Sequence, residues 1–110
     1  MTTHFVSTPT CVLGVGLIGG SLMRDLAAAD APTYGWNRSA NTADAAREEG
    51  FDVGTDLDSV LRRAQEDKAL LVIGVPMFAV GGLLDRINEL APDCGITDVV
   101  SVKAAVQDEI

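Results

Sequence analysis

The sequence predicts an α/β fold in which helices cover both faces of a doubly wound parallel sheet. Short apolar segments alternate with segments whose apolar residues recur every three or four positions, as expected for strands joined by crossover helices. With 110 residues, of which 47% are hydrophobic and 22% charged, the chain has the size of one folded domain. It contains no linker, repeat or low-complexity segment, so we interpret residues 1–110 as a single domain.

Five strands and at least four helices are predicted in alternating order. Ser39 is a plausible N-cap for an Ala-rich helix that Gly50 closes, and Thr55 or Asp56 is a candidate cap for the next helix. The uninterrupted apolar run 70–75 is typical of a central strand buried on both faces. The predicted strands are 11–15, 33–36, 51–54, 70–75 and 96–100. The predicted helices are 18–29, 40–49, one marked by Leu57, Val60, Leu61 and Ala64, one with a stripe of Val80, Leu83, Leu84, Ile87 and Leu90, and the start of another from Lys103.

Composition excludes several classes of function. Sixteen acidic and eight basic residues give a formal net charge of −8, which argues against nucleic-acid binding. Cys11 and Cys94 fit no metal or redox spacing, so we expect no metal site. We interpret both as small apolar residues in a reducing compartment; the alternative is a disulfide between them. The N-terminus lacks the features of a secretory signal, and the longest uncharged apolar run, 69–84, is too short to span a bilayer. We therefore expect a cytoplasmic protein.

A glycine motif carries the clearest chemical signal. Gly14, Gly16 and Gly19 match G-x-G-x-x-G, and the motif follows a predicted strand and opens a predicted helix that begins near Leu17 and Ile18. Gly14 would allow the tight turn, Gly16 the approach of a pyrophosphate, and Gly19 close packing of helix on strand. Free N–H groups at the helix start would hold the phosphates despite the acidic net charge. The sequence thus predicts a Rossmann-type dinucleotide-binding domain; the alternative is that these glycines serve only a tight turn.

The end of the second predicted strand indicates which dinucleotide binds. NAD-binding domains usually place Asp or Glu there, about 20 residues after the glycines, to bind the ribose 2′-hydroxyl. Here Asn37, Arg38 and Ser39 stand instead, and Asn37 lies 23 residues after Gly14. Arg38 can bind a phosphate bidentately, and Asn37 and Ser39 can donate hydrogen bonds to it. We therefore expect NADP rather than NAD, although Ser39 could act only as a cap and Arg38 could be merely solvated.

Two further segments are expected at the carboxyl edge of the sheet, where ligands of such folds bind. Val75, Pro76 and Met77 follow the fourth predicted strand and would line the adenine or ribose side, although Pro76 could serve only to end the strand. Ser101 follows the fifth predicted strand and could direct its hydroxyl at the nicotinamide or the substrate, or cap the terminal helix.

Four segments together resemble the N-terminal half of prephenate dehydrogenase, in the group that includes arogenate dehydrogenase. These segments are GVGLIGGSL (14–22), GWNRS (35–39), VIGVP (72–76) and TDVVSVK (97–103), and their order and spacing span nearly the whole chain. The resemblance implies oxidative decarboxylation of prephenate or arogenate in tyrosine biosynthesis, with a hydride passed to the nicotinamide. It also implies cofactor binding by the three glycines, 2′-phosphate recognition by residues 37–39 and an active-site role for Ser101.

The sequence departs from this family in two ways. Val100 stands where members commonly have Gly. In addition, the family takes its catalytic His from a segment beyond the SVK stretch, and its substrate and dimer contacts from a following helical domain. His4, the one histidine here, lies in the N-terminal tail, before the first predicted strand. We therefore expect a fragment, truncated at its C-terminal end, that binds cofactor without turnover, while the complete enzyme would be a homodimer joined through the helical domain.

Two other functions remain open. The chain could belong to another NADP-linked reductase, such as a 3-hydroxyacid dehydrogenase or a pyrroline-carboxylate reductase, although the SVK stretch argues against this. It could also be a free-standing nucleotide-binding module without a catalytic partner.

Overall fold

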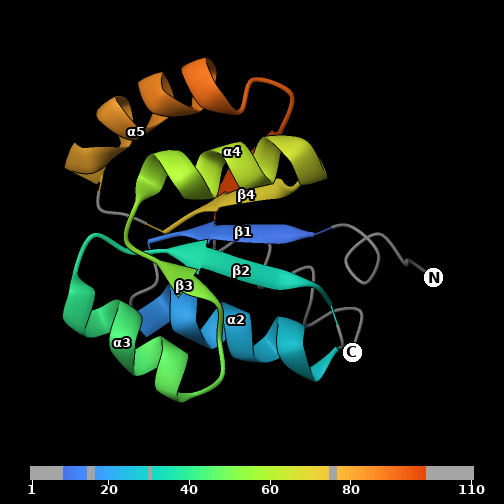
Figure 1. Cartoon of the computed structure of the whole chain (residues 1–110), viewed down its shortest axis with the longest axis vertical. Coiled ribbons are helices and arrows are strands. Elements are labelled where there is room, and N and C mark those ends of the chain that lie inside the picture. The colour runs from blue at the N-terminus through green and yellow to red at the C-terminus, as the bar shows by residue number, and fades with distance from the viewer. Residues whose placement is uncertain (1–8, 15–16, 30, 75–76, 99–110) are drawn as a thin grey trace.

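The computed structural model describes residues 9–14, 17–29, 31–74 and 77–98, with the backbone alone for 17–18 and 77–80. In these ranges five parallel strands form one sheet in the order β3-β2-β1-β4-β5, and four helices cover its two faces (Figure 1). The predicted doubly wound α/β fold is therefore confirmed. The elements are β1 (Thr10–Leu13), α2 (Leu17–Ala28), β2 (Thr33–Trp36), α3 (Ala40–Glu48), β3 (Val53–Gly54), α4 (Leu57–Asp67), β4 (Leu70–Ile73), α5 (Met77–Leu90) and β5 (Gly95–Asp98).

The chain starts in the middle of the sheet and winds outward twice. From β1 it passes to β2 and β3 on one side, then crosses back to β4 and β5 on the other side. Helices α2 and α3 cover one face of the sheet, and α4 and α5 cover the opposite face (Figure 1). The direction of winding therefore reverses between β1 and β4, which is the place where parallel sheets of this kind open a crevice for ligands.

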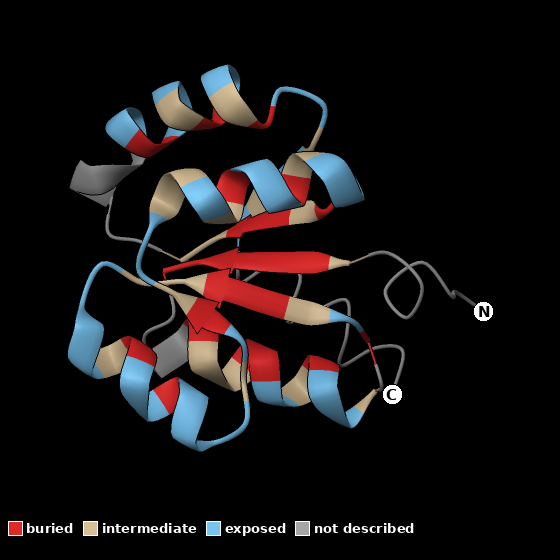
Figure 2. Cartoon of the chain, viewed as in Figure 1, coloured by how far each residue is buried: buried red, intermediate tan, exposed pale blue. Residues whose placement is uncertain are grey.

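Alternating side chains of β1 supply both halves of the core. Val12 packs in the cluster that contains Leu22 of α2, whereas Cys11 and Leu13 pack in the cluster that contains Leu61 of α4. All five side chains are fully buried. Figure 2 shows buried residues running along the strands and exposed residues on the outer sides of the helices. A strand buried on both faces reads as a continuous apolar run, and for this reason the sequence pattern located it.

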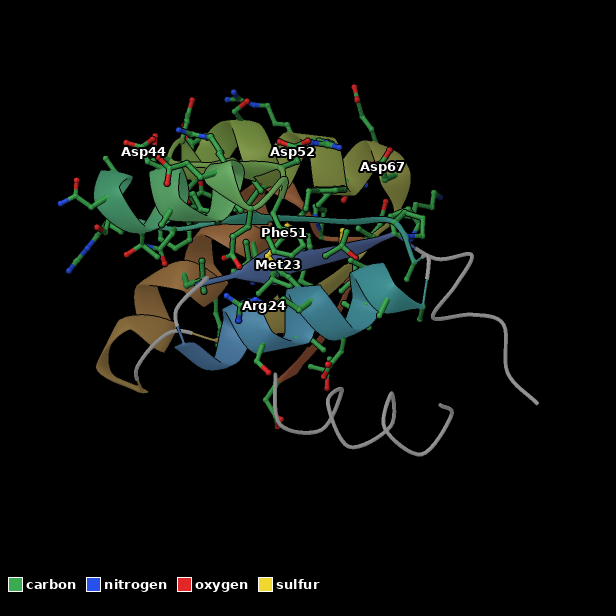
Figure 3. All side chains as sticks on the ribbon, turned by 90° about the horizontal axis from the view of Figure 1, so that it is seen from below. Met23, Arg24, Asp44, Phe51, Asp52 and Asp67 are labelled. Atoms are coloured by element: carbon green, nitrogen blue, oxygen red, sulfur yellow. The ribbon has the colours of Figure 1, made fainter. Side chains whose placement is uncertain are left out.

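The α2/α3 side of the core is filled by large side chains. Met23 of α2 is fully buried, and Phe51, which precedes β3, packs against the same cluster (Figure 3). The labelled carboxylates Asp44, Asp52 and Asp67 are exposed. Acidic side chains thus lie outside the core, as their hydration requires.

The strand and helix boundaries agree closely with the sequence patterns where a local signal sets them. Strand β2 has the predicted bounds, and α3 begins after the predicted N-cap Ser39, whose Oγ accepts a hydrogen bond from the Thr42 N–H at 3.4 Å. Gly50 has φ +97°, as a helix-terminating glycine can. Asp56 occupies the N-cap position of α4, but its side chain makes no capping hydrogen bond.

Several expectations from the sequence need correction. Strand β3 begins at Val53 rather than at residue 51, and β4 ends at Ile73, so that Gly74 lies outside it. Strand β1 ends at Leu13 rather than at residue 15, because Gly14 adopts φ +100° and so leaves the extended conformation.

Leu84, predicted to belong to the buried stripe of α5, is 40% exposed, whereas Leu83 and Ile87 are buried. The last two turns of α5 contain more apolar residues than the side facing the sheet can cover, so Leu84, at the margin of the apolar stripe, remains in contact with solvent. The predicted helix after residue 103 lies outside the described residues.

Helix α4 is fastened to β2 by contacts around one tyrosine. The Tyr34 hydroxyl donates a hydrogen bond to Asp67 Oδ2 at 2.8 Å, and the Arg63 guanidinium lies 3.7 Å from the centre of the Tyr34 ring. Arg63 also pairs with Asp52, with Nη1 and Oδ2 2.6 Å apart. Burial and the hydrogen bond to Asp67 raise the pKa of Tyr34 above its usual value. The phenol therefore stays protonated and continues to donate.

The two cysteines are free thiols. Cys11 of β1 pairs with Leu71 of β4, and Cys94 lies just before β5, on the far side of β4. Two strand spacings amount to roughly 9.6 Å, whereas a disulfide needs Cα atoms within about 7 Å. The intervening strand therefore prevents a disulfide. Cys94 instead donates a hydrogen bond to the carbonyl oxygen of Ala64 at 3.3 Å.

Alkaline pH should destabilise the domain through Cys11. Burial raises the pKa of this thiol from 9.0 to about 12, so between these values the folded state keeps a proton that the unfolded chain releases. The free energy of unfolding should therefore fall as pH rises through 9, by roughly 1 kcal/mol between pH 8 and pH 10. Urea unfolding across this range measures the decline. Cys11→Ala should decline less steeply, and equal slopes for the two proteins would contradict this assignment.

Candidate functional site

The carboxyl edge of the sheet brings together three segments that are distant in sequence. In the strand register Leu13 lies beside Trp36 on one side and Ile73 on the other. Gly14, Asn37 and Gly74 therefore follow three neighbouring strands at the same level, at the left end of the strands in Figure 1. This edge contains the reversal of winding between β1 and β4, and it is the candidate dinucleotide site.

Gly14, Gly19 and Gly74 lie close together at the end of β1, where the backbone is crowded. Gly14 has φ +100°, a conformation that side chains disfavour, and its N–H donates to the Trp36 carbonyl at 2.8 Å. A Cβ on Gly19 would lie 2.6 Å from the Gly14 oxygen, and a Cβ on Gly74 would lie 2.8 Å from the same atom. The Gly14 carbonyl is thus enclosed by α2 on one side and by the end of β4 on the other. Gly14 makes the tight turn and Gly19 the close packing of helix on strand that the motif predicts, while their part in cofactor binding stays a prediction.

Helix α2 presents a favourable end to an anion. It begins at Leu17, three residues after Gly14, and its first turn contains no acidic residue. The first N–H groups of a helix lack partners within the helix, and the helix dipole places partial positive charge there. This start can receive a phosphate without competition from a carboxylate on its own first turn.

The segment after β2 is held by its backbone. The Asn37 N–H donates to the Gly54 carbonyl at 3.0 Å, and Asn37 Nδ2 lies 3.4 Å from the carbonyl oxygen of Ser39. Ser39 caps α3, so its predicted role as a cap is confirmed, whereas a phosphate contact stays a prediction. These bonds fix the path of the chain on both sides of Arg38.

Arg38 is an exposed cation with no partner among the residues that the structure describes. In the described part of the chain it makes no hydrogen bond or ion pair, and of the other described arginines only Arg62, on α4, is likewise unpaired. A guanidinium at this edge that is free of protein carboxylates can bind a phosphate without first breaking an ion pair. The occupied arginines pair as Arg24 with Glu49, Arg47 with Asp44, Arg63 with Asp52, and Arg86 with Asp58 and Glu89.

Several predicted site residues fall outside what the structure describes. Leu17, Ile18 and Met77 lie in helices, but their side chains are not described. Gly16, Val75, Pro76 and Ser101 lie outside the described residues, so their predicted contacts stay predictions. Among the residues that are described, no cluster of three His, Cys, Asp or Glu could hold a metal ion, and no helix is long and apolar enough to cross a membrane.

Two residues at this edge were missed by the sequence analysis. Gly74 follows the apolar fourth strand, and its backbone lies so close to the Gly14 carbonyl oxygen that a Cβ would be 2.8 Å from it. Trp36 was assigned only to the second strand, yet its indole Nε1–H donates to the Thr55 carbonyl at 3.0 Å. The position of Gly74, one residue after a buried strand, was a signal in the sequence that could have indicated its role. The sequence carries no signal for the hydrogen bond of Trp36, because this bond depends on where the end of β3 lies in space.

Comparison with known proteins identifies the kind of domain. Residues 10–109 match the family model described as the NAD binding domain of 6-phosphogluconate dehydrogenase. A search of curated proteins gave no match. A solved structure described as a putative prephenate dehydrogenase from Corynebacterium glutamicum is 52% identical, with a TM-score of 0.80 over 84% of this chain. The resemblance found in the sequence motifs is thereby confirmed.

The solved structures are considerably longer than this chain. The alignment covers 29% of the Corynebacterium glutamicum protein. An imine reductase from Aspergillus terreus, solved with NADPH4, aligns with 84% of this chain and 40% of its own, at a TM-score of 0.58 and 17% identity. At that identity the likeness concerns the fold alone.

Proposed function

Because the chain belongs to the family described as the NAD binding domain of 6-phosphogluconate dehydrogenase, we propose that it is the NADP-binding domain of an oxidoreductase acting on prephenate or arogenate. The observation that supports the choice of cofactor is Arg38, two residues after β2, which is exposed and makes no ion pair among the described residues, where NAD-binding domains usually have a carboxylate. The 52% identity to the Corynebacterium glutamicum protein supports the substrate half.

The described residues suit a dinucleotide with a 2′-phosphate. The start of α2 leaves backbone N–H groups for the pyrophosphate, and no acidic side chain lies in the first turn of that helix. Asn37 and Ser39 bring no negative charge beside Arg38. When bound, the nicotinamide would accept a hydride from the substrate. The role of this domain is to bind and orient the cofactor, so that the substrate meets it in one geometry.

The reaction of the whole protein is proposed from the Corynebacterium glutamicum structure, of which the alignment covers 29%. We propose that prephenate or arogenate is the small-molecule substrate and that the reaction serves tyrosine biosynthesis. A following helical domain would contribute the substrate contacts and would join two subunits into a homodimer. Oxidation of prephenate and of arogenate by the full-length protein tests the substrate. No described residue of this chain is proposed as a catalyst, and Ser101 is the candidate for an active-site hydroxyl.

The cofactor proposal predicts a clear effect of Arg38→Ala. Wild type should bind NADPH more tightly than NADH, and the variant should lose about 10- to 100-fold in NADPH affinity, because hydrogen bonds to a charged group contribute about 1.5–3 kcal/mol. Its NADH affinity should stay unchanged, because NADH lacks the 2′-phosphate. Calorimetric titration with each dinucleotide measures both affinities.

Arg62→Ala is the matched control for this experiment. Arg62 lies on α4, is exposed, and makes no hydrogen bond or ion pair in the described part of the chain. Arg62→Ala removes one positive charge, as Arg38→Ala does. Any effect of net charge on the affinity for the dinucleotide should therefore appear in both variants. Equal affinity of the wild type for NADPH and NADH would overturn the cofactor proposal.

A further inference from the structure

Trp36 joins three segments of the carboxyl edge. Its main-chain carbonyl accepts the Gly14 N–H at 2.8 Å, and its indole Nε1–H donates to the Thr55 carbonyl at 3.0 Å. Its ring, half-buried, packs against the apolar cluster under α4. The last residue of β2 is therefore tied to the glycine turn after β1 and to the segment after β3.

The indole bond lies immediately before the residues proposed to bind the 2′-phosphate. The adjoining Asn37 N–H donates to the carbonyl oxygen of Gly54, one residue before Thr55. Two neighbouring residues, Trp36 and Asn37, therefore donate hydrogen bonds to two neighbouring carbonyl groups where the paired strands β2 and β3 end. Arg38 has no partner of its own in the described part of the chain. The position of its backbone therefore depends on these neighbouring bonds, and a bidentate guanidinium contact is sensitive to small displacements.

We propose that Trp36 is a positioning residue for 2′-phosphate recognition, because its indole hydrogen bond to Thr55 holds the chain that leads into Arg38. The proposal rests on the NADP preference proposed above. It concerns the indole N–H itself rather than the bulk of the ring. The Thr55 carbonyl lies in an exposed segment and can accept from water when the indole is absent, so the bond contributes mainly to local geometry.

Trp36→Phe tests this proposal, with Tyr34→Phe as the matched control. Both residues lie on β2, pack in the same apolar cluster and donate one side-chain hydrogen bond, but Tyr34 is two residues further from the edge and donates to Asp67. Affinities for NADPH and NADH are measured by calorimetry for the wild type and both variants. Trp36→Phe should weaken NADPH binding about three- to tenfold and leave NADH binding unchanged, as expected for the loss of about one hydrogen bond. Tyr34→Phe should leave the ratio of the two affinities as in the wild type.

The outcomes separate this inference from the proposed function. A wild type without preference for NADPH overturns the proposed function, and this inference with it. A wild-type preference that Trp36→Phe retains in full overturns the inference alone. Equal weakening of NADPH and NADH also overturns it, because Trp36 would then support the whole edge rather than the phosphate contact. Thermal unfolding checks that each variant folds. If Trp36→Phe does not fold, Trp36→Tyr, whose larger side chain fills more of the space of the indole ring, is measured in its place.

Discussion

Gly19→Ala should destabilise the domain and weaken dinucleotide binding together. The new Cβ would lie 2.6 Å from the Gly14 carbonyl oxygen and 3.3 Å from Val12 Cγ1, so the backbone of α2 or of the turn must move. Overpacking of this kind costs about 1–3 kcal/mol. The same movement displaces the N–H groups at the start of α2, and a loss of 1.4 kcal/mol in their phosphate contacts would already weaken binding about tenfold. Urea unfolding and titration with NADPH measure the two effects.

Gly20→Ala is the control for this prediction. Gly20 lies on the same helix, one residue further along, and a Cβ there would meet no atom within 4 Å. Alanine is the better helix former by up to about 1 kcal/mol, so this variant should be as stable as the wild type or more stable. Gly74→Ala, which approaches the Gly14 oxygen at 2.8 Å from β4, should behave like Gly19→Ala. Wild-type stability and binding in both crowded variants would show that the turn is not constrained as described.

Leu71→Ala should produce a large loss of stability. Leu71 of β4 is fully buried in the cluster between the sheet and α4 and α5. Truncation of a buried leucine removes its transfer free energy and leaves a cavity, at a cost of about 2–5 kcal/mol. Domains of this size are stable by about 5–15 kcal/mol, so the variant should lose a substantial part of the total. Urea unfolding at neutral pH gives the difference directly.

Leu84→Ala provides the comparison for Leu71→Ala. It removes the same atoms from α5, but Leu84 is 40% exposed, and the expected loss is below about 1 kcal/mol. If the two variants lost similar amounts, the described burial of β4 would be wrong. This pair also tests the correction to the α5 stripe, because a buried Leu84 would behave like Leu71.

Local signals in the sequence were sufficient where a short-range rule determines the structure. Ser39 as a helix cap, the bounds of β2 and the apolar run of β4 were predicted because each depends on neighbouring residues alone. The glycine spacing predicted the turn between β1 and α2 for the same reason. The absence of a carboxylate near residue 37 also needed no structure, since it is a property of residue type.

The tertiary structure decided which residues meet at the carboxyl edge. The parallel register places Gly74 beside Gly14, which is 60 positions earlier in the sequence, and the end of β3 beside Trp36. No periodicity carries this information, because it arises from the order of strands rather than from the pattern within one strand. The sequence by itself thus determined the fold class and the residues proposed to select NADP. Only the packed sheet decided how Gly19 and Gly74 enclose one carbonyl and why Leu84, on a helix with excess apolar residues, faces solvent.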